Sequence, residues 1–396
     1  MKILVLNSGS STLKFKLIQT AGAASQERLA DGLIERIGGN GRYRFTRGDA
    51  PPDEKPVTVA NHEEGVGLVI AWLQSVPELG RPEAVGHRVV HGGQKFSEAA
   101  AIDDGVIRDL ETLCEMAPLH NPVALSGIRA ARKLLGRATP MVAVFDTSFH
   151  RHMPEYAATY AIPLELARKH AIQRYGFHGL AHEYDIARYA ELSGKRVEEV
   201  NAITLHLGNG CSASAVRNGR SVDTSMGFTP LEGLVMGTRS GDLDAALIGY
   251  LARKENVDAA QVENWLNKTS GLLGVSGISG DMRELIAAYD DQPRARLAVD
   301  IFCYRARKYV GAYLAALGGA EAIIFSGGIG ENSAVVRRAI CRSLNWFGIT
   351  LDLSANDAVS GRDGCISTTD SRVKVFVIRT DEEAIIARET ARIIGT

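Results

Sequence analysis

Length, composition and charge exclude several classes of protein. At 396 residues the chain is too long for one ordinary hydrophobic core, so two domains are expected. The formal net charge is −1, which argues against a nucleic-acid groove or a basic membrane-binding face. The five cysteines are scattered without a C-x-x-C pair, and no apolar run suits a signal peptide or a membrane-spanning helix, so we expect a reduced, cytoplasmic protein.

The first segment of the chain, residues 3–17, predicts a hairpin with phosphate-binding chemistry in its turn. Residues 3–6 are a short apolar run, residues 7–12 are rich in Ser and Gly, and apolar residues then alternate with lysines. Such a turn presents backbone N–H groups and short hydroxyls, which approach phosphate oxygens closely. An ordinary tight hairpin would explain one instance, but residues 203–216 repeat the pattern. The repeat predicts a duplicated fold with a phosphate-binding hairpin in each half.

The remaining predicted elements give an α/β fold with mixed sheets and flanking helices in two similar halves. Helices are predicted over residues 61–75, 106–115, 121–135, 182–193, 244–255 and 293–317. Strands are predicted over residues 84–91, 140–145, 320–325 and 373–378. An irregular segment, residues 150–170, is expected to cross between the halves. Neither a Walker A sequence nor a G-x-G-x-x-G fingerprint is present, so nucleotide binding requires another architecture.

Two local signals predict how elements reverse or begin. Asn218-Gly219 is typical of a type I′ turn, because both central residues of that turn need a positive φ. Thr380 and Glu383 have the spacing of a capping box, in which each side chain satisfies a backbone N–H group at the start of a helix. A terminal helix is therefore expected to begin at this point.

Two arginines are candidates for binding a small anionic ligand. Arg88 and Val90 alternate along a predicted strand and should share one face, which suits a ligand with an anionic end and a short hydrocarbon end. A buried salt bridge explains Arg88 equally well when this segment is taken alone. Arg239 lies between glycines in a predicted loop, where packing gives few reasons for an arginine. The planar guanidinium binds carboxylates and phosphates through two N–H groups.

Histidines beside glycines are further candidates. His178 and His182 have the i, i+4 spacing of a metal-binding pair, but the glutamate of H-E-x-x-H is absent and the flanking glycines favour a turn, so zinc is disfavoured. A histidine in such a turn more readily contacts a ligand oxygen. His120 lies in a similar loop, with capping of the following helix as its alternative role.

Two acidic residues follow predicted strands. Asp146 comes directly after a buried strand, where open α/β sheets place catalytic groups. Glu382 also follows a strand, with helix capping or a helix-dipole contact as its alternative role. In a nucleotide kinase Mg²⁺ binds one or two carboxylates and keeps several waters. As carboxylates, both Asp146 and Glu382 are candidate metal ligands, and their positions in the sequence do not show which of them binds the metal.

Ten motifs occur in the order seen in acetate kinases, and the sequence resembles that family from residue 2 to about residue 390. The motifs are NSGSSTLK, GHRVVHGG, APLHNP, FDTSFH, YGFHG, HLGNG, MGTRSGD, SGDMR, GGIGEN and TDEE. The family belongs to the superfamily of acetate and sugar kinases, Hsp70 and actin. The resemblance implies a homodimer whose chains have two actin-like (ribonuclease H-like) domains around a cleft. The implied domains are residues 1–148 with the terminal helix 383–396, and residues 149–382.

The resemblance also implies catalytic roles. Arg88 and Arg239 would hold the acetate carboxylate and the phosphoryl group, and His178 would stabilise the transition state with His120 nearby. Asp146 would be the essential acidic residue. Asn7 would help to position the phosphoryl group and the metal, and Glu382 would be a ligand of the metal. The metal would be Mg²⁺, with Mn²⁺ as the alternative.

Two substrate-binding sets follow from the same resemblance. The residues implied to surround the acetate methyl group are Val90, Leu119, Phe177 and Pro230. The residues implied to hold ATP or ADP are Lys14, His206, Leu207, Gly208, Asn209, Gly210, Asp281, Met282, Arg283, Gly328, Ile329, Gly330, Glu331 and Asn332. Two positions are less typical of the family: Thr12, where serine is common, and Met282, where a phenylalanine can flank the adenine.

The implied reaction is the reversible, Mg²⁺-dependent, in-line transfer of the γ-phosphoryl group of ATP to acetate, which gives acetyl phosphate and ADP. The acetate carboxylate is already deprotonated at pH 7, so no general base is needed. Catalysis then depends on positioning and on positive charge from the arginines, the histidine and the metal. We therefore expect Asp146 to position metal or water rather than to abstract a proton. No nucleic-acid or membrane partner is expected.

Three alternatives remain at this point. A propionate or butyrate kinase of the same family would share most motifs and differ in pocket volume. A pyrophosphate-dependent variant is disfavoured because Gly327 and Gly328 should leave room for an adenosine. A non-enzymatic ATP-binding member of the superfamily is disfavoured because Arg88 and Arg239 are present and no appended domain is.

Overall fold

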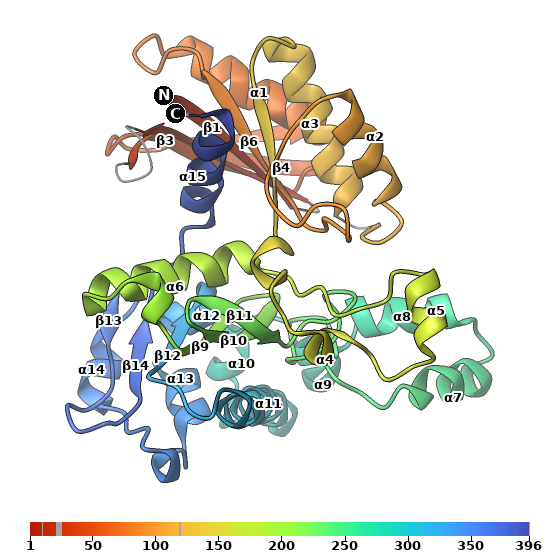
Figure 1. Ribbon diagram of the computed structural model, residues 1–396, viewed down its shortest axis with the longest axis vertical. Coiled ribbons are helices and arrows are strands. Elements are labelled where there is room, and N and C mark those ends of the chain that lie inside the picture. Colours follow the sequence, from red (N-terminus) through yellow and green to blue (C-terminus); the bar gives the residue numbers. More distant parts are fainter. Residues whose placement is uncertain (10, 21–25, 119, 396) are drawn as a thin grey trace. The chain divides into compact units, whose positions relative to one another are not determined.

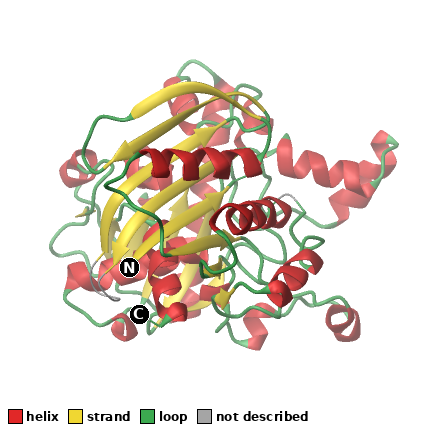
Figure 2. Ribbon diagram, turned by 90° about the horizontal axis from the view of Figure 1, so that it is seen from above, coloured by secondary structure: helices red, strands yellow, loops and turns green. Residues whose placement is uncertain are grey.

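The computed structural model describes residues 1–9, 11–20, 26–118 and 120–395. The chain forms two compact units, Met1–Ser148 with Asp381–Thr396, and Phe149–Thr380. Each unit contains one mixed β-sheet with helices packed against it (Figures 1 and 2). The α/β class predicted from the sequence is therefore confirmed.

The sheet of the first unit has the strand order β5-β4-β3-β2-β1-β6-β8-β7. Its strands are β1 (Lys2–Ser8), β2 (Thr12–Thr20), β3 (Gln26–Glu35), β4 (Gly39–Arg47), β5 (Asp53–Val59), β6 (Ala84–Val89), β7 (Ala100–Ala101) and β8 (Met141–Phe145). Strands β1 to β5 form an antiparallel meander, whereas β6 and β8 run parallel to β1. The carboxyl ends of β1, β6 and β8 therefore lie at one edge of this sheet.

Helices cover both faces of this sheet. They are α1 (His62–Ser75), α2 (Asp104–Thr112), α3 (Asn121–Leu135) and α15 (Glu382–Ile394). Leu4 and Leu6 of β1 pack with Val66 of α1 and Ala130 of α3 in one core cluster. Helix α15 packs on the other face, where a Cβ atom on Gly86 would lie only 2.4 Å from Oγ1 of Thr390. Because both faces are covered, β1 is a continuous apolar run rather than an alternating one.

The sheet of the second unit has the strand order β11-β10-β9-β12-β14-β13. Its strands are β9 (Ala202–Leu207), β10 (Cys211–Arg217), β11 (Arg220–Thr224), β12 (Ala322–Ser326), β13 (Gly364–Cys365) and β14 (Lys374–Val377). An antiparallel β11-β10-β9 meander continues into the parallel strands β12 and β14. This order repeats β3-β2-β1-β6-β8 of the first unit, which confirms the predicted duplication and the actin-like (ribonuclease H-like) fold.

The helices of the second unit are α4 (Glu155–Ala158), α5 (Leu164–Lys169), α6 (Gly179–Ser193), α7 (Ala246–Glu255), α8 (Ala259–Lys268), α9 (Gly271–Ser276), α10 (Met282–Ala287), α11 (Pro293–Leu317), α12 (Gly327–Asn332), α13 (Ala334–Cys341) and α14 (Leu353–Ala358). Short 3₁₀ helices are Val197–Glu199, Asn345–Phe347 and Ser148–His150, the last of which begins at the final residue of the first unit's main segment. Helix α6 covers one face of the sheet, with Ile186 packed against Ala202 and Ile324. Helix α11 packs on β9 and β10 from the other side (Figure 1).

Three local predictions were wrong. Residues 150–170 are not irregular throughout, because α4 and α5 each begin directly after a proline, Pro154 and Pro163, whose fixed φ suits a helix start. The strand predicted over residues 84–91 ends at Val89. The capping box is absent, because Asp381 is the N-cap of α15 and accepts a hydrogen bond from Ala384 N at 3.1 Å. Aspartate caps a helix as well as threonine does, so the helix starts one residue later.

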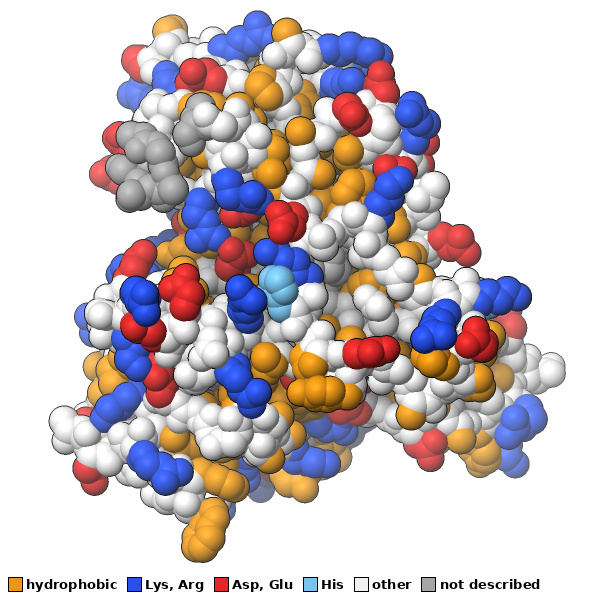
Figure 3. Space-filling model, viewed as in Figure 1, with side chains coloured by type: hydrophobic (Ala, Val, Ile, Leu, Met, Phe, Trp, Pro, Cys, Tyr) orange, Lys and Arg blue, Asp and Glu red, His pale blue; other side chains and the backbone are white. Residues whose placement is uncertain are grey.

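Other local predictions agree with the structure. Asn218 and Gly219 both have positive φ, 52° and 72°, as a type I′ turn requires. All five cysteines are free thiols. Acidic and basic side chains are interspersed on the face shown in Figure 3. Among the described residues, no helix is both long enough and apolar enough to cross a bilayer.

Candidate active site

Part of the predicted site lies at the carboxyl edge of the parallel strands of the first unit. Asn7 is near the end of β1, Arg88 near the end of β6, and Asp146 directly follows β8. The backbone N–H of Asp146 donates to Val89 O at 3.0 Å, which continues the pairing of β8 with β6. Glu382 is the first residue of α15, the helix packed over these strands. The fold therefore brings together four predicted residues from four distant stretches of sequence.

Arg88 and Asp146 form a bidentate ion pair. Nε of Arg88 donates to Oδ1 of Asp146 at 2.8 Å, and Nη2 donates to Oδ2 at 2.7 Å. The Asp146 side chain is 1% exposed, so water does not weaken this pair. Burial alone lowers the pKa of Arg88, but the charges of Asp146 and Glu382 outweigh it and raise that pKa above its usual value. The salt bridge that was the alternative explanation of Arg88 is present, and it keeps the guanidinium charged.

Asn7 and two glutamates surround the other side of the Arg88 guanidinium. Nη1 of Arg88 lies 3.1 Å from Oδ1 of Asn7 and 3.2 Å from Oε2 of Glu382. Asn7 in turn donates to Oε1 of Glu383 at 3.0 Å. Glu383 also lies 3.5 Å from the Lys16 amine. Glu383, expected only in a capping box, and Lys16 were not predicted as site residues, although Lys16 shares a strand face with Lys14 in the sequence pattern.

This cluster has more negative than positive groups. Its carboxylates belong to Asp146, Asp381, Glu382 and Glu383, and its cations are Arg88 and Lys16. An excess of carboxylate and amide oxygens suits a hard divalent cation such as Mg²⁺. Within the described residues, no group of three or more His, Cys, Asp or Glu side chains has the arrangement of a metal cage. The carboxylate and amide oxygens present fit a hard divalent cation held by one or two protein ligands with several waters.

The other predicted residues of the first unit are less closely grouped. Lys14 is exposed on β2, opposite Asn7 in the strand register. His120 directly precedes α3, but its side chain does not cap that helix. Val90 is half-buried and lies one residue beyond the end of β6, so strand alternation no longer fixes which face it shares with Arg88. Leu119 lies outside the described residues.

In the second unit, Arg239 and His178 converge on Gly210. A Cβ atom on Gly210 would lie 2.7 Å from Nη2 of Arg239 and 3.1 Å from Cε1 of His178. Nη1 of Arg239 donates to Pro230 O at 2.7 Å, which places a further predicted residue, Pro230, beside Arg239. Burial lowers the pKa of Arg239, and no carboxylate of the described residues forms an ion pair with it. A partly buried cation without an anionic partner is suited to an anionic ligand.

His178 has an unusual backbone conformation. Its φ of 56° and ψ of 25° are in the left-handed region, where residues other than glycine are uncommon. It immediately precedes α6, and Phe177 before it is buried with 1% exposure. On the preceding turn, a Cβ atom on Gly176 would lie 2.5 Å from Cγ2 of Thr224, so only glycine fits there. Strained residues of this kind cluster at functional sites.

His182 does not form a metal-binding pair with His178. Its Nε2 lies 3.0 Å from Oγ of Ser212, and its Nδ1 lies 2.7 Å from Oγ1 of Thr204. Both ring nitrogens are therefore occupied by hydroxyl groups. Burial holds the pKa of His182 well below its usual value, so the ring is neutral. The structure thus assigns His182 to the interior of the second unit.

The predicted nucleotide-binding segments of the second unit lie at neighbouring places on its sheet. Residues 206–210 comprise the end of β9 and its connection to β10, and α12 directly follows β12, which pairs in parallel with β9. Gly327 has a φ of 73°, and a Cβ atom there would lie 2.7 Å from Leu207 O. Gly327 therefore allows its backbone to pass close to Leu207 of β9. That the glycines here leave room for an adenosine stays a prediction. A Cβ atom on Gly328 would meet no described atom within 4 Å.

Several nucleotide-binding candidates have structural partners. Glu331 accepts hydrogen bonds from Gly327 N at 3.1 Å and Thr380 N at 3.2 Å. Burial raises the pKa of Glu331. Asp281 is the N-cap of α10 and pairs with the exposed Arg283, whereas Met282 is 3% exposed. Glu331 and Met282 therefore have packing roles in the second unit, and their contacts with a nucleotide stay a prediction.

Comparison with known proteins identifies the family. The sequence profile of the acetokinase family matches residues 2–388. The chain belongs to the acetokinase family. The resemblance drawn from the ten motifs is confirmed, and family membership makes the protein a kinase, with ATP or ADP as a substrate and a divalent metal ion as cofactor.

Relatives match the acetokinase chain over its whole length. The acetate kinase of Chloroherpeton thalassium is 49% identical over 413 aligned residues, covering 100% of this chain and 99% of that protein. Among solved structures, the acetate kinase of Porphyromonas gingivalis is 40% identical with a TM-score of 0.90, and 99% of each chain is covered. A propionate kinase from Francisella tularensis is 39% identical with a TM-score of 0.92, again over 99% of each chain.

One network of this acetokinase was missed at the sequence level. The buried Asp185 of α6 accepts hydrogen bonds from Ser326 Oγ at 2.5 Å and Thr380 Oγ1 at 2.7 Å. Ser326 also lies 3.1 Å from Nδ1 of His206. Because the Ser326 hydroxyl donates its proton to Asp185, it accepts a hydrogen bond from Nδ1 of His206. An aspartate within a predicted helix gave no signal of this role.

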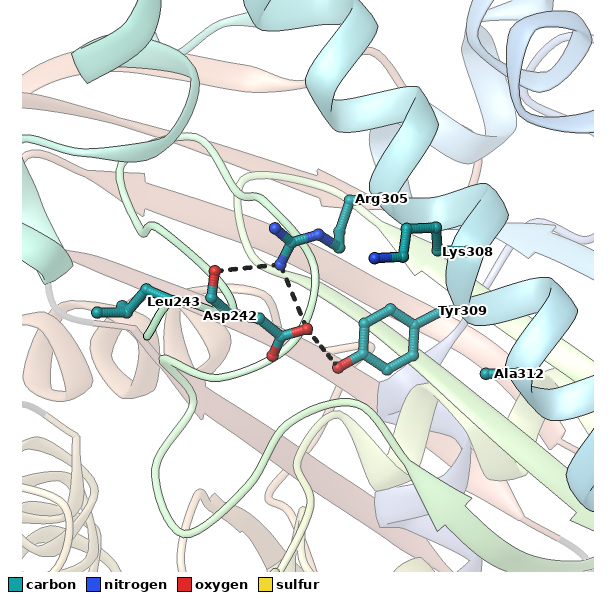
Figure 4. A pocket seen from close by; sticks show the side chains of 6 residues that line it. All are labelled: Asp242, Leu243, Arg305, Lys308, Tyr309 and Ala312. Carbon is teal, nitrogen blue, oxygen red and sulfur yellow. Dashed lines mark hydrogen bonds and ion pairs between the residues drawn. The ribbon is translucent and has the colours of Figure 1, made fainter. Parts of the chain in front are cut away.

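Two cavities of the second unit are lined by other residues. One cavity of the second unit has a volume of about 520 Å³ and is lined by six residues, shown in Figure 4. Another, of about 810 Å³, lies between α11, α13 and α14. Neither cavity contains a residue predicted from the sequence. The candidate site is recognised by its converging charged groups.

Proposed function

We propose that this kinase transfers the γ-phosphoryl group of ATP to acetate and forms acetyl phosphate and ADP. The observation that carries the proposal is Arg239, a cation beside His178 and Gly210 that lacks an ion-pair partner among the described residues. Such a group binds an anion. Because the relatives are acetate kinases, we take acetate as the acceptor of the phosphoryl group. The proposed domains are residues 1–148 with 383–396, and residues 149–382. A cytoplasmic homodimer is part of the proposal.

In the proposed reaction an acetate oxygen attacks the γ-phosphorus atom. The new bond joins this oxygen to phosphorus, and the bond to the β–γ bridging oxygen breaks, so that ADP leaves with the electron pair. No proton moves at the acceptor, because the carboxylate is already ionised. Arg88, Arg239 and His178 offset the charge of two anions brought together. Asn7 and Glu382 would hold Mg²⁺, which when bound supplies positive charge at the phosphate oxygens.

The contacts of Asp146 support a positioning role. Both of its carboxylate oxygens accept hydrogen bonds from Arg88. The ion pair fixes the plane of the guanidinium and therefore the direction of its remaining N–H groups. We propose that Asp146 acts chiefly through Arg88.

Trapping of the product tests the proposed function. The wild-type protein is mixed with ATP, Mg²⁺ and acetate, and acyl phosphate is trapped with hydroxylamine as the coloured hydroxamate. The proposal expects hydroxamate formation that requires all three components, with acetate preferred over propionate and butyrate. ATP hydrolysis without hydroxamate would overturn it.

The role of Glu382 leads to a prediction about metal dependence. Glu382→Gln should raise the Mg²⁺ concentration for half-maximal rate at least about 10-fold, because one carboxylate ligand is lost. Glu383→Gln is the matched control, since Glu383 contacts Asn7 and Lys16. This control should lower the melting temperature more than it shifts the Mg²⁺ dependence. A Glu382 variant with wild-type Mg²⁺ dependence would assign that carboxylate to structure.

Propionate is the second candidate substrate, because a propionate kinase is among the similar solved structures. Val90 is half-buried and two residues from Arg88, and we propose that it limits the space beside the acetate methyl group. An added methylene changes binding in an apolar pocket by only about 1–3 kcal/mol, or 10- to 200-fold. Selectivity for acetate is therefore expected to be moderate.

Val90→Ala should shift the ratio of kcat/KM values toward propionate, mostly by improving propionate. Both acids are measured on wild type and variant. Phe177→Leu is the comparison, because the proposed pocket also includes Phe177 and Pro230. An unchanged ratio in Val90→Ala would assign the selectivity to those residues, and a wild type that prefers propionate would refute the acetate assignment.

A further inference from the structure

The loop that carries Arg239 has almost no regular structure. It connects β11 to α7 and includes Pro230, whose carbonyl accepts a hydrogen bond from Arg239. A loop without a ladder of backbone hydrogen bonds is held in place by contacts with more rigid elements. The position of the Arg239 guanidinium therefore depends on what fixes this loop.

Asp242 closes the loop on itself. Its backbone N–H donates to Gly233 O at 3.0 Å, and its Oδ1 accepts from Gly233 N at 2.9 Å. Gly233 has a φ of 106°, and a Cβ atom there would lie 2.5 Å from Ser225 O. These two hydrogen bonds join residues on either side of Arg239 into one closed loop.

Two residues of α11 hold Asp242 from outside the loop (Figure 4). Nη1 of Arg305 lies 3.2 Å from Oδ2 of Asp242 and donates to the Asp242 carbonyl oxygen at 3.2 Å. The Tyr309 hydroxyl donates to the same Oδ2 at 2.9 Å. Burial, and then the charge of Asp242, raise the pKa of Tyr309, so the hydroxyl keeps its proton. Helix α11 spans 25 residues and packs on the sheet, so it is a rigid support.

We propose that Arg305 and Tyr309, acting through Asp242, position Arg239 for phosphoryl transfer. The inference rests on the proposed function, in which Arg239 contacts the substrates. Arg305, Tyr309 and Asp242 are positioning residues, and we call them the loop clamp. They line a cavity of about 520 Å³, so the clamp is reachable from solvent. Loss of the clamp should reduce kcat without weakening ATP binding.

A double-mutant cycle tests whether the clamp acts through Arg239. Asp242→Asn keeps the shape of the side chain but removes the charge that holds Arg305. It should lower kcat by about 10- to 100-fold while KM for ATP changes less than about 2-fold. In an Arg239→Ala background the same change should alter kcat by less than about 3-fold, because residues that act as a unit are not additive. Equal effects in both backgrounds would overturn the proposal.

Chemical rescue supplies a second readout. Arg305→Ala removes the guanidinium from the wall of the cavity, where guanidinium ion from solvent can take its place. Low concentrations of guanidinium should restore kcat at least about 10-fold, whereas urea, which has the same shape without the charge, should not. Lys308→Gln is the matched control on the same helix and cavity, and it should keep wild-type kcat. Equal effects of guanidinium and urea on Arg305→Ala would contradict a charge-dependent clamp.

Hydrogen exchange separates this inference from the proposed function. In Asp242→Asn, amides of residues 233–242 should exchange faster, while those of β9 and β10 should not change. This measurement needs no catalytic activity. A wild type that forms no acyl phosphate would overturn the proposed function, and unchanged exchange over residues 233–242 would overturn the clamp.

Discussion

Replacement of Arg239 by alanine is expected to reduce kcat at least about 100-fold, which corresponds to a few kcal/mol of lost charge stabilisation. The physical reason is that no carboxylate of the described residues neutralises Arg239, so its charge is available to the reacting anions. The loss should appear in kcat more than in KM for ATP, because the interaction strengthens as charge develops during transfer. Initial rates at saturating ATP and acetate measure it.

Two control variants sharpen this result. Arg239→Lys keeps the charge but loses the planar pair of N–H groups, so it should recover only part of the rate. Arg253→Ala removes a positive charge from the exposed end of α7 and should leave kcat unchanged. If Arg239→Ala folds normally and retains most of its turnover, Arg239 is a structural residue and the proposed mechanism loses its main cation.

Replacement of Asp146 by asparagine is expected to reduce both turnover and stability. Asp146 is 1% exposed and pairs with Arg88 through both oxygens, so the variant leaves a largely enclosed guanidinium without its strongest partner. Breaking one side of a buried ion pair typically costs about 3–5 kcal/mol of folding free energy. Turnover should fall about 100-fold or more, because Arg88 is no longer held in one orientation.

The metal dependence of Asp146→Asn distinguishes two roles. If Asp146 acts through Arg88, the Mg²⁺ concentration for half-maximal rate should stay near the wild-type value while kcat falls. If Asp146 positions metal or water, as the reaction chemistry first indicated, that concentration should rise as in Glu382→Gln. Urea unfolding of each variant gives the free energy of unfolding, so loss of folded protein can be separated from loss of turnover.

The fold could be predicted from the sequence where the signals are local. Residues 121–135 and 293–317 were predicted as helices with the bounds that α3 and α11 have. The duplicated fold was predicted from the two hairpins. The pattern of each hairpin, an apolar run, a turn and an alternating strand, lies within about 15 residues of sequence. By contrast, Asp381 displaced Thr380 as the N-cap because both residue types cap helices well.

The chemistry of the candidate site was predictable, but its contacts were not. Arg88, Asp146 and Glu382 were predicted as site residues because each is charged and each follows or ends a strand. The hydrogen bond between Asn7 and Glu383 joins residues 376 positions apart, and no spacing rule reaches that far. Glu331 and Asp185 show the same limit, because a polar side chain gives no sign in the sequence that it will turn inward and hold other elements together.

The place of α15 has a consequence for synthesis of the chain. The second unit is continuous, Phe149–Thr380, and all of it precedes the last segment of the first unit, Asp381–Thr396. A ribosome therefore delivers the whole second unit before α15 can pack on β1 and β6. Strands β1 and β6 are synthesised early and α15 is synthesised last. One face of their sheet therefore stays uncovered until α15 has been made. Nascent chains of this protein thus complete their second unit before their first, the reverse of the usual order.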